Sequence, residues 1–183
     1  DSAIFKKLES SIRNQKYINI EYHEKEELKN YEVKPYKVVF INENFYLACE
    51  IDTEYLQFAM YRISKLKSIE DTKKTYQRNI DIENFIKDMQ SPLSRYTSNY
   101  RENLIDVIIN VSSAKAYFFK VKKHLKSQEI LETNDDGSLN VRFRVTQDRE
   151  VEDIIKKWIP HIKVISPLSL KEKIEDELRG YLQ

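Results

Sequence analysis

The chain has 183 residues, a length that holds one domain or two small ones. Hydrophobic residues make up 40% of it and charged residues 33%, and the formal net charge is only +1, so no global field attracts nucleic acid. The two glycines exclude a Gly-rich phosphate-binding loop, and the single cysteine excludes an internal disulfide. Any nucleic-acid binding must therefore use a local patch.

The composition and the ends of the sequence also bear on location. No apolar run approaches the ~20 residues that a membrane span needs, and no secretory signal is visible. We therefore expect no membrane association and a cytoplasmic location, which fits the single cysteine, Cys49. Cys49 alternates with apolar residues, which favours a buried thiol over a nucleophile. The chain opens with Asp1 and not with methionine, which indicates a fragment or a processed product.

The first eighty residues predict one helix followed by five strands. Apolar residues recur at helical spacing after Ser2, which can cap a helix. Ile18 and Ile20 alternate with polar residues, as in a half-buried strand. Pro35 cannot donate to a ladder, so its strand should be an edge or contain a bulge or a bend. The expected elements are a helix over residues 3–14 and strands over residues 16–23, 31–41, 45–51, 55–61 and 65–70, which fit a small closed or nearly closed barrel.

Residues 81–103 predict a short helix capped by Asp81 and then a polar linker that contains proline and serine but no apolar periodicity. The remaining residues predict the order βαββαβα, an open α+β sandwich of the ferredoxin-like kind. Its first helix, which Ser112 or Ser113 caps, should bury one apolar face and leave its lysines in solvent. That face consists of Ala114, Tyr117, Phe118, Val121 and Leu125. We thus expect a first domain over residues 1–80, a linker with a short helix over 81–103, and a second domain over 104–183.

Catalytic residues are not recognisable in this sequence. His23, His124 and His161 lie in three different predicted elements, and none has a neighbour at metal-ligand spacing. No Gly-x-Ser-x-Gly nucleophile motif is present, and the carboxylate clusters lie in predicted turns. We expect a protein that is not an enzyme and that needs no metal and no cofactor.

Binding residues are easier to nominate. Side chains alternate along residues 45–51, so Tyr46 points outward if Leu47 faces the core. An exposed tyrosine can stack on a base, although a cross-strand packing role is equally compatible. Alternation along the next strand would place Phe58, Met60 and Arg62 on its core face, where an unpaired guanidinium is very costly. Either the strand ends at Tyr61, or Arg62 meets a carboxylate or an anionic ligand such as phosphate.

Two arginines in the second half form another candidate. Arg142 and Arg144 alternate with apolar residues and share the outer face of a predicted hairpin strand. They either contact an effector or partner subunit or line the solvated side of an open sheet.

Three short motifs resemble a known family. Pro-Tyr at residues 35–36, Phe-Tyr-Leu at 45–47 and Arg-Ile at 62–63 resemble the pattern of a WYL domain. The ending Val-Ile-Ser-Pro-Leu at 164–168 resembles the WCX extension that often follows it. Two positions depart from the family pattern: Phe45 replaces a tryptophan, and Ala59 stands where a second arginine is common.

The resemblance implies an Sm-like (SH3-like) five-stranded β-barrel with an N-terminal helix, followed by the α/β sandwich. It also implies a groove that binds a single-stranded nucleic acid or a nucleotide, with Arg62 facing the ligand and Tyr36 nearby; Lys34 shares the strand face of Tyr36. Members are usually bacterial transcription regulators that contact promoter DNA through a helix-turn-helix domain, which we do not find in this chain, and we expect a homodimer.

We therefore interpret the sequence as the effector-sensing and dimerisation region of a WYL-family regulator. The alternative is a protein–protein interaction and dimerisation module that binds no ligand.

Overall fold

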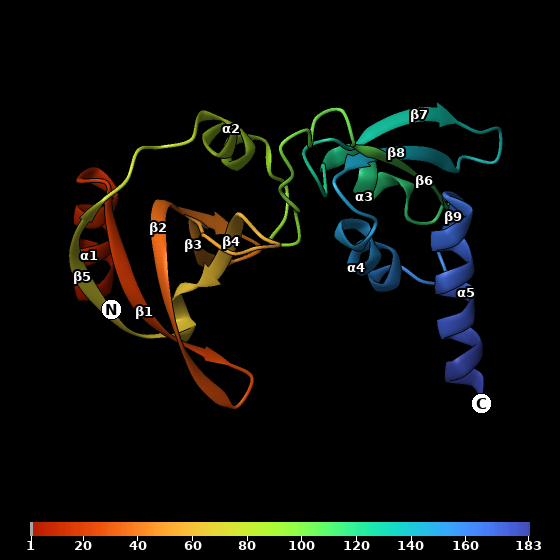
Figure 1. The fold of residues 1–183 in the computed structure, drawn as a ribbon. Coiled ribbons are helices and arrows are strands. Elements are labelled where there is room, and N and C mark those ends of the chain that lie inside the picture. The colour runs from red at the N-terminus through yellow and green to blue at the C-terminus, as the bar shows by residue number, and fades with distance from the viewer. Residues whose placement is uncertain (1) are drawn as a thin grey trace. The chain divides into compact units, whose positions relative to one another are not determined.

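The computed structural model describes residues 2–183 and shows an α+β protein with two antiparallel sheets and five α-helices (Figure 1). The α+β class predicted from the sequence is thereby confirmed. The chain divides into two compact units. Unit 1 runs to Pro92 and includes Tyr96–Ser98, whereas unit 2 comprises Leu93–Arg95 and Asn99–Gln183. The predicted linker contributes to both units, and its exact boundaries stay a prediction.

Unit 1 has the predicted helix and five strands, but its sheet is not closed. The strand order is β4-β3-β2-β1-β5, so β4 and β5 are edges that do not pair with each other. The predicted closed barrel is therefore absent from unit 1 as the structure describes it. The elements are α1 (Ser2–Arg13), β1 (Lys16–Glu24), β2 (Glu27–Ile41), β3 (Asn44–Glu50), β4 (Phe58–Arg62), a 3-10 helix (Ile63–Lys65), β5 (Leu66–Thr75) and α2 (Ile80–Asp88).

The core of unit 1 lies between α1 and one face of this sheet. Leu8 of α1 packs with Ile18 of β1 and Leu47 of β3, and all three side chains are fully buried. Cys49 belongs to the same cluster, and burial raises the pKa of its thiol well above its usual value. The prediction of a core thiol is thus confirmed.

The turns explain where the strands differ from the prediction. The first hairpin is tighter than expected: Glu24 pairs with Glu27, and Lys25 adopts a positive φ of 56°. Glu24 and Glu27 thus belong to the two strands, and only Lys25 and Glu26 form the turn. In contrast, β4 begins later than predicted because Thr53 closes a loop, with its hydroxyl accepting a hydrogen bond from the Leu56 N–H at 2.9 Å.

Two local predictions concern a proline and a helix cap. Pro35 lies at a register shift between β2 and β3, which confirms the predicted bulge. The short helix α2 is capped by Asn79 and not by Asp81, because the Asn79 carboxamide accepts a hydrogen bond from the Asp81 N–H at 2.9 Å.

Unit 2 has the predicted element order βαββαβα. Its four strands form a sheet in the order β7-β8-β6-β9, and α3, α4 and α5 bury apolar side chains against a single face of it. Figure 1 shows α4 and α5 on the same side of this sheet. The elements are β6 (Ile105–Val111), α3 (Ala116–Val121), β7 (Glu129–Thr133), β8 (Leu139–Val145), α4 (Arg149–Lys157), β9 (Ile162–Ser166) and α5 (Leu168–Leu182).

The face of α3 that packs on the sheet is not the predicted one. Ala116 and Phe119 are buried, whereas Tyr117, Phe118 and Val121 are exposed. The reason is the length of α3, which has only six residues. A helix that short cannot extend the predicted stripe to Leu125, so its packing is decided by the two residues nearest to the sheet.

Two features are absent from residues 2–183. No helix among them is long and apolar enough to cross a membrane. Their His, Cys, Asp and Glu side chains form no group of three or more that could hold a metal ion.

Candidate nucleic-acid interface

The pairing register of β3 and β4 positions the side chains of the candidate site. Tyr46 lies directly opposite Arg62, and Leu47 lies opposite Tyr61. Leu47 and Tyr61 both belong to the core. Tyr46 and Arg62 therefore share the opposite, outer face of the sheet. The prediction that Arg62 lies on the core face was wrong, because the aromatic ring of Tyr61 takes that place and packs edge-to-face on Tyr22.

Helix α2 covers only one end of this outer face. Phe58, at the start of β4, is buried, and its ring lies 5.0 Å from that of Phe85 in α2. Arg62 and Tyr46, at the other end of the strand pair, stay partly exposed. The outer face thus has a packed end and an open end, and the open end carries the arginine.

The guanidinium of Arg62 is held by an amide and not by a carboxylate. Its Nε donates to the Asn44 Oδ1 at 3.0 Å, and its Nη2 donates to the same oxygen. Asn44 is itself oriented by a hydrogen bond of 2.7 Å from its Nδ2 to the Asn42 carbonyl. No carboxylate of residues 2–183 forms a salt bridge with Arg62. Since a guanidinium has five N–H donors, most of them remain available to an anion.

A cavity of about 660 Å³ lies beside this site. Three consecutive β4 residues, Ala59, Met60 and Tyr61, line it. Because consecutive side chains point to opposite faces, the cavity follows the free edge of β4. Tyr22 lines the cavity too, and its hydroxyl accepts a hydrogen bond of 3.3 Å from the Arg62 backbone N–H. Burial raises the pKa of Tyr22, which keeps it a neutral phenol.

Lys34 and Tyr36 lie on β2, opposite the C-terminal end of β3. Lys34 Nζ is 3.0 Å from Asp52 Oδ1 and 3.7 Å from Glu50 Oε1. Tyr36 is buried; its hydroxyl donates to Glu50 Oε2 at 2.6 Å and accepts from the Asn79 N–H at 2.7 Å. Both side chains are thus engaged by unit 1 itself. The structure brings Tyr46 and Arg62 together and separates Lys34 and Tyr36 from them.

Removing the hydroxyl of Tyr36 should reduce stability more than removing that of Tyr46, because only Tyr36 is held by hydrogen bonds within the described residues of unit 1. Tyr36→Phe leaves the Glu50 carboxylate and the Asn79 N–H without their shared partner, and we expect a loss of about 1–3 kcal/mol in the free energy of unfolding. Tyr46→Phe is the matched control, because the Tyr46 hydroxyl makes no hydrogen bond to any described residue. Urea denaturation followed by far-UV circular dichroism measures both. Equal stability of the two variants would contradict the structural role of Tyr36.

Arg142 and Arg144 are paired within unit 2. Arg142 Nη2 lies 2.5 Å from Glu129 Oε2, and Arg144 Nε lies 3.1 Å from Asp106 Oδ1. Both face away from the core, as predicted, but each contacts a carboxylate of a neighbouring strand. This arrangement favours the solvated-face interpretation over direct effector contact.

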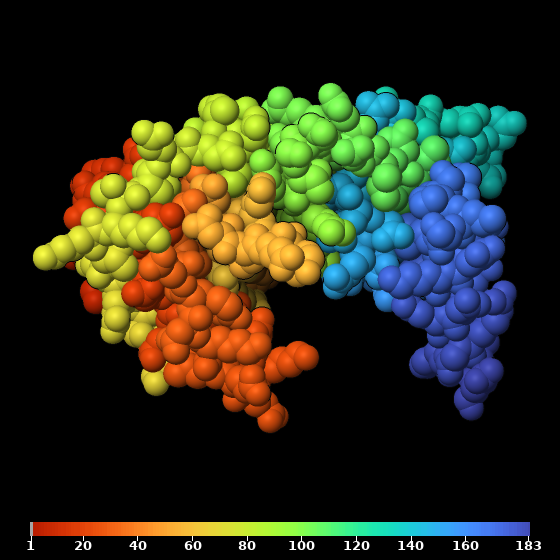
Figure 2. Space-filling view, in the orientation of Figure 1, coloured from red at the N-terminus to blue at the C-terminus, as the bar shows by residue number. Residues whose placement is uncertain are grey.

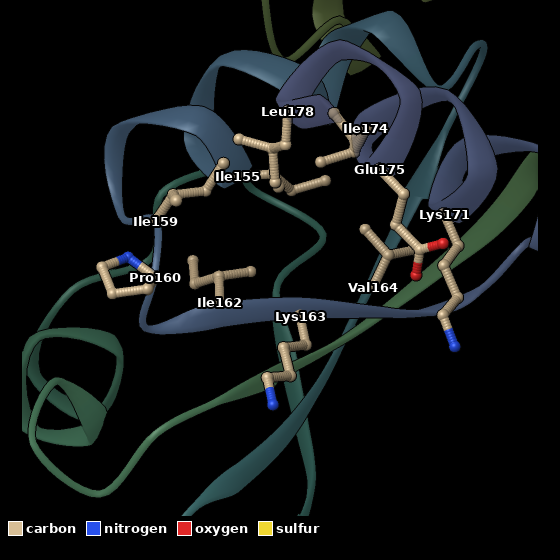
Figure 3. A pocket seen from close by; sticks show the side chains of 10 residues that line it. All are labelled: Ile155, Ile159, Pro160, Ile162, Lys163, Val164, Lys171, Ile174, Glu175 and Leu178. Carbon is tan, nitrogen blue, oxygen red and sulfur yellow. The ribbon is translucent and has the colours of Figure 1, made fainter. Parts of the chain in front are cut away.

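Unit 2 also contains an apolar cavity of about 460 Å³ that the sequence did not predict. Figure 3 shows isoleucines of α4, β9 and α5 pointing into it, whereas the ammonium groups of Lys163 and Lys171 point away. The cavity therefore offers apolar contacts and no cation, unlike the open end of β3 and β4.

Sequence reasoning missed two residues of the interface. Asn44 falls between the strands predicted over residues 31–41 and 45–51, and Tyr22 is one of several alternating residues in the strand predicted over 16–23. The pairing of the strands brings both residues to the site. Asn44 follows a tight turn in which Asn42 and Glu43 have positive φ values of 50° and 62°. As the first residue of β3, Asn44 points to the same face of the sheet as Tyr46.

Comparison with known families agrees with this architecture. The WYL domain matches residues 3–70, and the WCX domain matches residues 103–182. The chain therefore belongs to the family of WYL-domain proteins that also carry a WCX domain, as its motifs indicated. No protein of curated function matches the chain.

Two solved structures are similar to the chain. A CRISPR Cas-related protein has 14% identity and a TM-score of 0.58, with 97% of this chain and 50% of that chain covered. Proteasome accessory factor B/C (PafBC) of Arthrobacter aurescens has 14% identity and a TM-score of 0.40, with 94% of this chain and 25% of that chain covered. The first similarity shows a shared fold and nothing about activity. The chain spans half the length of one protein and a quarter of the other.

Proposed function

We propose that unit 1 binds a nucleic-acid or nucleotide effector at the open end of β3 and β4. Arg62 contacts a phosphate, and Tyr46 stacks on a base. The observation that carries this proposal is the Arg62 guanidinium, which lies on a partly exposed face with an amide oxygen as its partner and no carboxylate among the described residues. Arginine presents a planar fork that matches phosphate, and an exposed aromatic ring accepts a base of any sequence.

The family supports a proposal for the biological role. Because the chain carries a WYL domain and a WCX domain, we propose that it is the sensing and dimerising part of a bacterial transcriptional regulator. Effector binding would bias the DNA-binding part of such a regulator only if the effector binds one arrangement of the protein more tightly than another. The proposal therefore includes a difference in effector affinity between two states of the full regulator.

Fluorescence anisotropy tests the binding step directly. A labelled 12-nucleotide oligo-dT is titrated with the protein at several salt concentrations. We expect saturable binding that weakens as salt increases, because phosphate contacts release counterions. Absence of binding at low salt, with both oligonucleotides and free nucleotides, would contradict the proposal.

A second function, an interaction module without ligand, is favoured by the end of α5. Figure 2 shows its last turns standing clear of the rest of unit 2. Tyr181 and Leu182 are largely exposed there, which suits contact with another protein. Light scattering of the wild type and of a Tyr181→Ser, Leu182→Ser variant tests this. The second function would be favoured if the wild type is a dimer, the variant is a monomer and the wild type binds no oligonucleotide.

A further inference from the structure

We propose that the surface around α3 in unit 2 is a second binding surface for single-stranded nucleic acid, independent of the Tyr46–Arg62 site. We call it the α3 surface and define it by the rings of Tyr117, Phe118 and Trp158 and the lysines Lys115, Lys122 and Lys157. Two independent properties support it: exposed aromatic rings and a local excess of unpaired positive charge.

The rings form a continuous row. Tyr117 is 67% exposed and Phe118 is 44% exposed. Their centroids lie 5.9 Å apart, and Phe118 lies 5.4 Å from Trp158. Tyr117 and Phe118 belong to the short helix α3 and are not part of the unit 2 core. Trp158, at the C-terminal end of α4, is half-buried and packs against that core. Exposed rings in a row provide a stacking platform for successive unpaired bases.

Lysines surround this row. Lys115 Nζ lies 5.6 Å from the centre of the Phe118 ring, and Lys157 Nζ lies 5.6 Å from that of Trp158. Lys122 directly follows α3 in the chain. Burial lowers the pKa of His124, whose ring centre lies 6.0 Å from that of Trp158, and the charges of Lys122 and Lys157 lower it further, so His124 is neutral at pH 7. The positive charge of the surface therefore comes from the lysines.

The segment that contains α3 is basic in sequence. No Asp or Glu occurs in residues 107–128, although this segment contains five lysines. Among the described residues, Lys115, Lys122 and Lys157 form no salt bridge, whereas Arg142, Lys156 and Lys173 each pair with a glutamate. In a chain whose net charge is only +1, this is a concentrated basic patch.

The combination favours single-stranded nucleic acid over other occupants. Protein interfaces are depleted in lysine, which argues against a second copy of this chain. A helix of six residues is short for an amphipathic membrane anchor. Bases can stack on exposed rings only when they are unpaired, and their phosphates complement the lysines.

The single tryptophan of the chain makes the test specific. Trp158 belongs to the α3 surface of unit 2, so its fluorescence reports on this surface, whereas Tyr46 and Arg62 belong to unit 1. We expect a 12-nucleotide oligo-dT to quench Trp158 in the wild type and equally in an Arg62→Ala, Tyr46→Ala variant. Loss of the quenching in that variant would overturn an independent surface, whereas failure of the unit 1 site alone leaves the quenching intact.

Variants separate stacking from charge. Tyr117→Ala with Phe118→Ala should weaken binding about tenfold for each base that no longer stacks, with little change in salt dependence. Lys115→Ala with Lys122→Ala should make the logarithmic salt slope shallower by roughly 0.7 for each phosphate that is no longer neutralised. The matched control for charge is the pair Lys163→Ala and Lys171→Ala, which lies elsewhere in unit 2 and should bind like the wild type.

Three results would overturn the proposal. The first is unchanged Trp158 fluorescence at low salt. The second is equal affinity for an abasic 12-mer of the same charge, which would show that the rings do not stack on bases. The third is quenching by vesicles that contain phosphatidylserine but not by oligo-dT, which would identify a membrane surface instead. Circular dichroism of each variant confirms that it is folded before it is compared.

Discussion

Replacing Arg62 by alanine is expected to weaken the binding of a single-stranded oligonucleotide by about 2–3 kcal/mol, or roughly 30- to 150-fold. The variant would lack the charge-assisted hydrogen bonds from the guanidinium to phosphate, and the salt slope should become shallower by roughly 0.7 for one phosphate. The structure adds an expectation about stability. Because Arg62 has an amide and no carboxylate partner among residues 2–183, its removal should change the melting temperature little.

Two further variants define which property of the site matters. Arg62→Lys keeps the charge but lacks the planar fork, so it should restore the salt slope and recover only part of the affinity. Tyr46→Ala should lower affinity by about 1–3 kcal/mol because a base can no longer stack there, with little change in slope. Anisotropy at four or more salt concentrations measures all of them. A destabilised Arg62→Ala that binds like the wild type would end the assignment of this site.

Replacing Phe143 by alanine is expected to destabilise unit 2 by about 3–5 kcal/mol. Phe143 lies on β8, is fully inaccessible to solvent and belongs to the core under α3, α4 and α5. Its removal leaves a cavity in a closely packed interior and should lower the melting temperature by more than about 10 °C. Trp158 fluorescence follows this transition, since the only tryptophan lies in unit 2.

The neighbouring residue provides the control. Arg144 is adjacent on the same strand but points to the other face, where it pairs with Asp106 in solvent. Arg144→Ala should therefore cost less than about 1 kcal/mol. Similar melting temperatures for the two variants would contradict the assignment of the core to one face of this sheet.

Local chemistry in the sequence predicted most of the elements. Apolar spacing identified the helix before β1 and the order of strands and helices in unit 2, and the missing N–H of Pro35 identified the bulge in β2. The short motifs at residues 35–36, 45–47 and 62–63 indicated the family. These features depend on a few consecutive residues, so they are present in the sequence itself.

The sequence-based predictions were wrong where either of two faces of a strand or helix could be buried. For β4, alternation allowed two assignments, and the choice of Phe58, Met60 and Arg62 as the core face was wrong. Phe58 is buried on the outer face instead, against Phe85 from a helix more than twenty residues later. For α3, the apolar stripe was real, but the helix is too short to bury it.

The sequence by itself determined that the chain joins a WYL domain to a WCX domain, that it forms α+β units, and that Tyr46 and Arg62 are candidates. Only the tertiary structure decided that these two side chains lie opposite each other, that Asn44 orients the guanidinium, and that Tyr36 and Lys34 are engaged elsewhere. The physical reason is that register between strands is set by packing and turn geometry over many residues, and a shift of one residue would move every side chain to the other face.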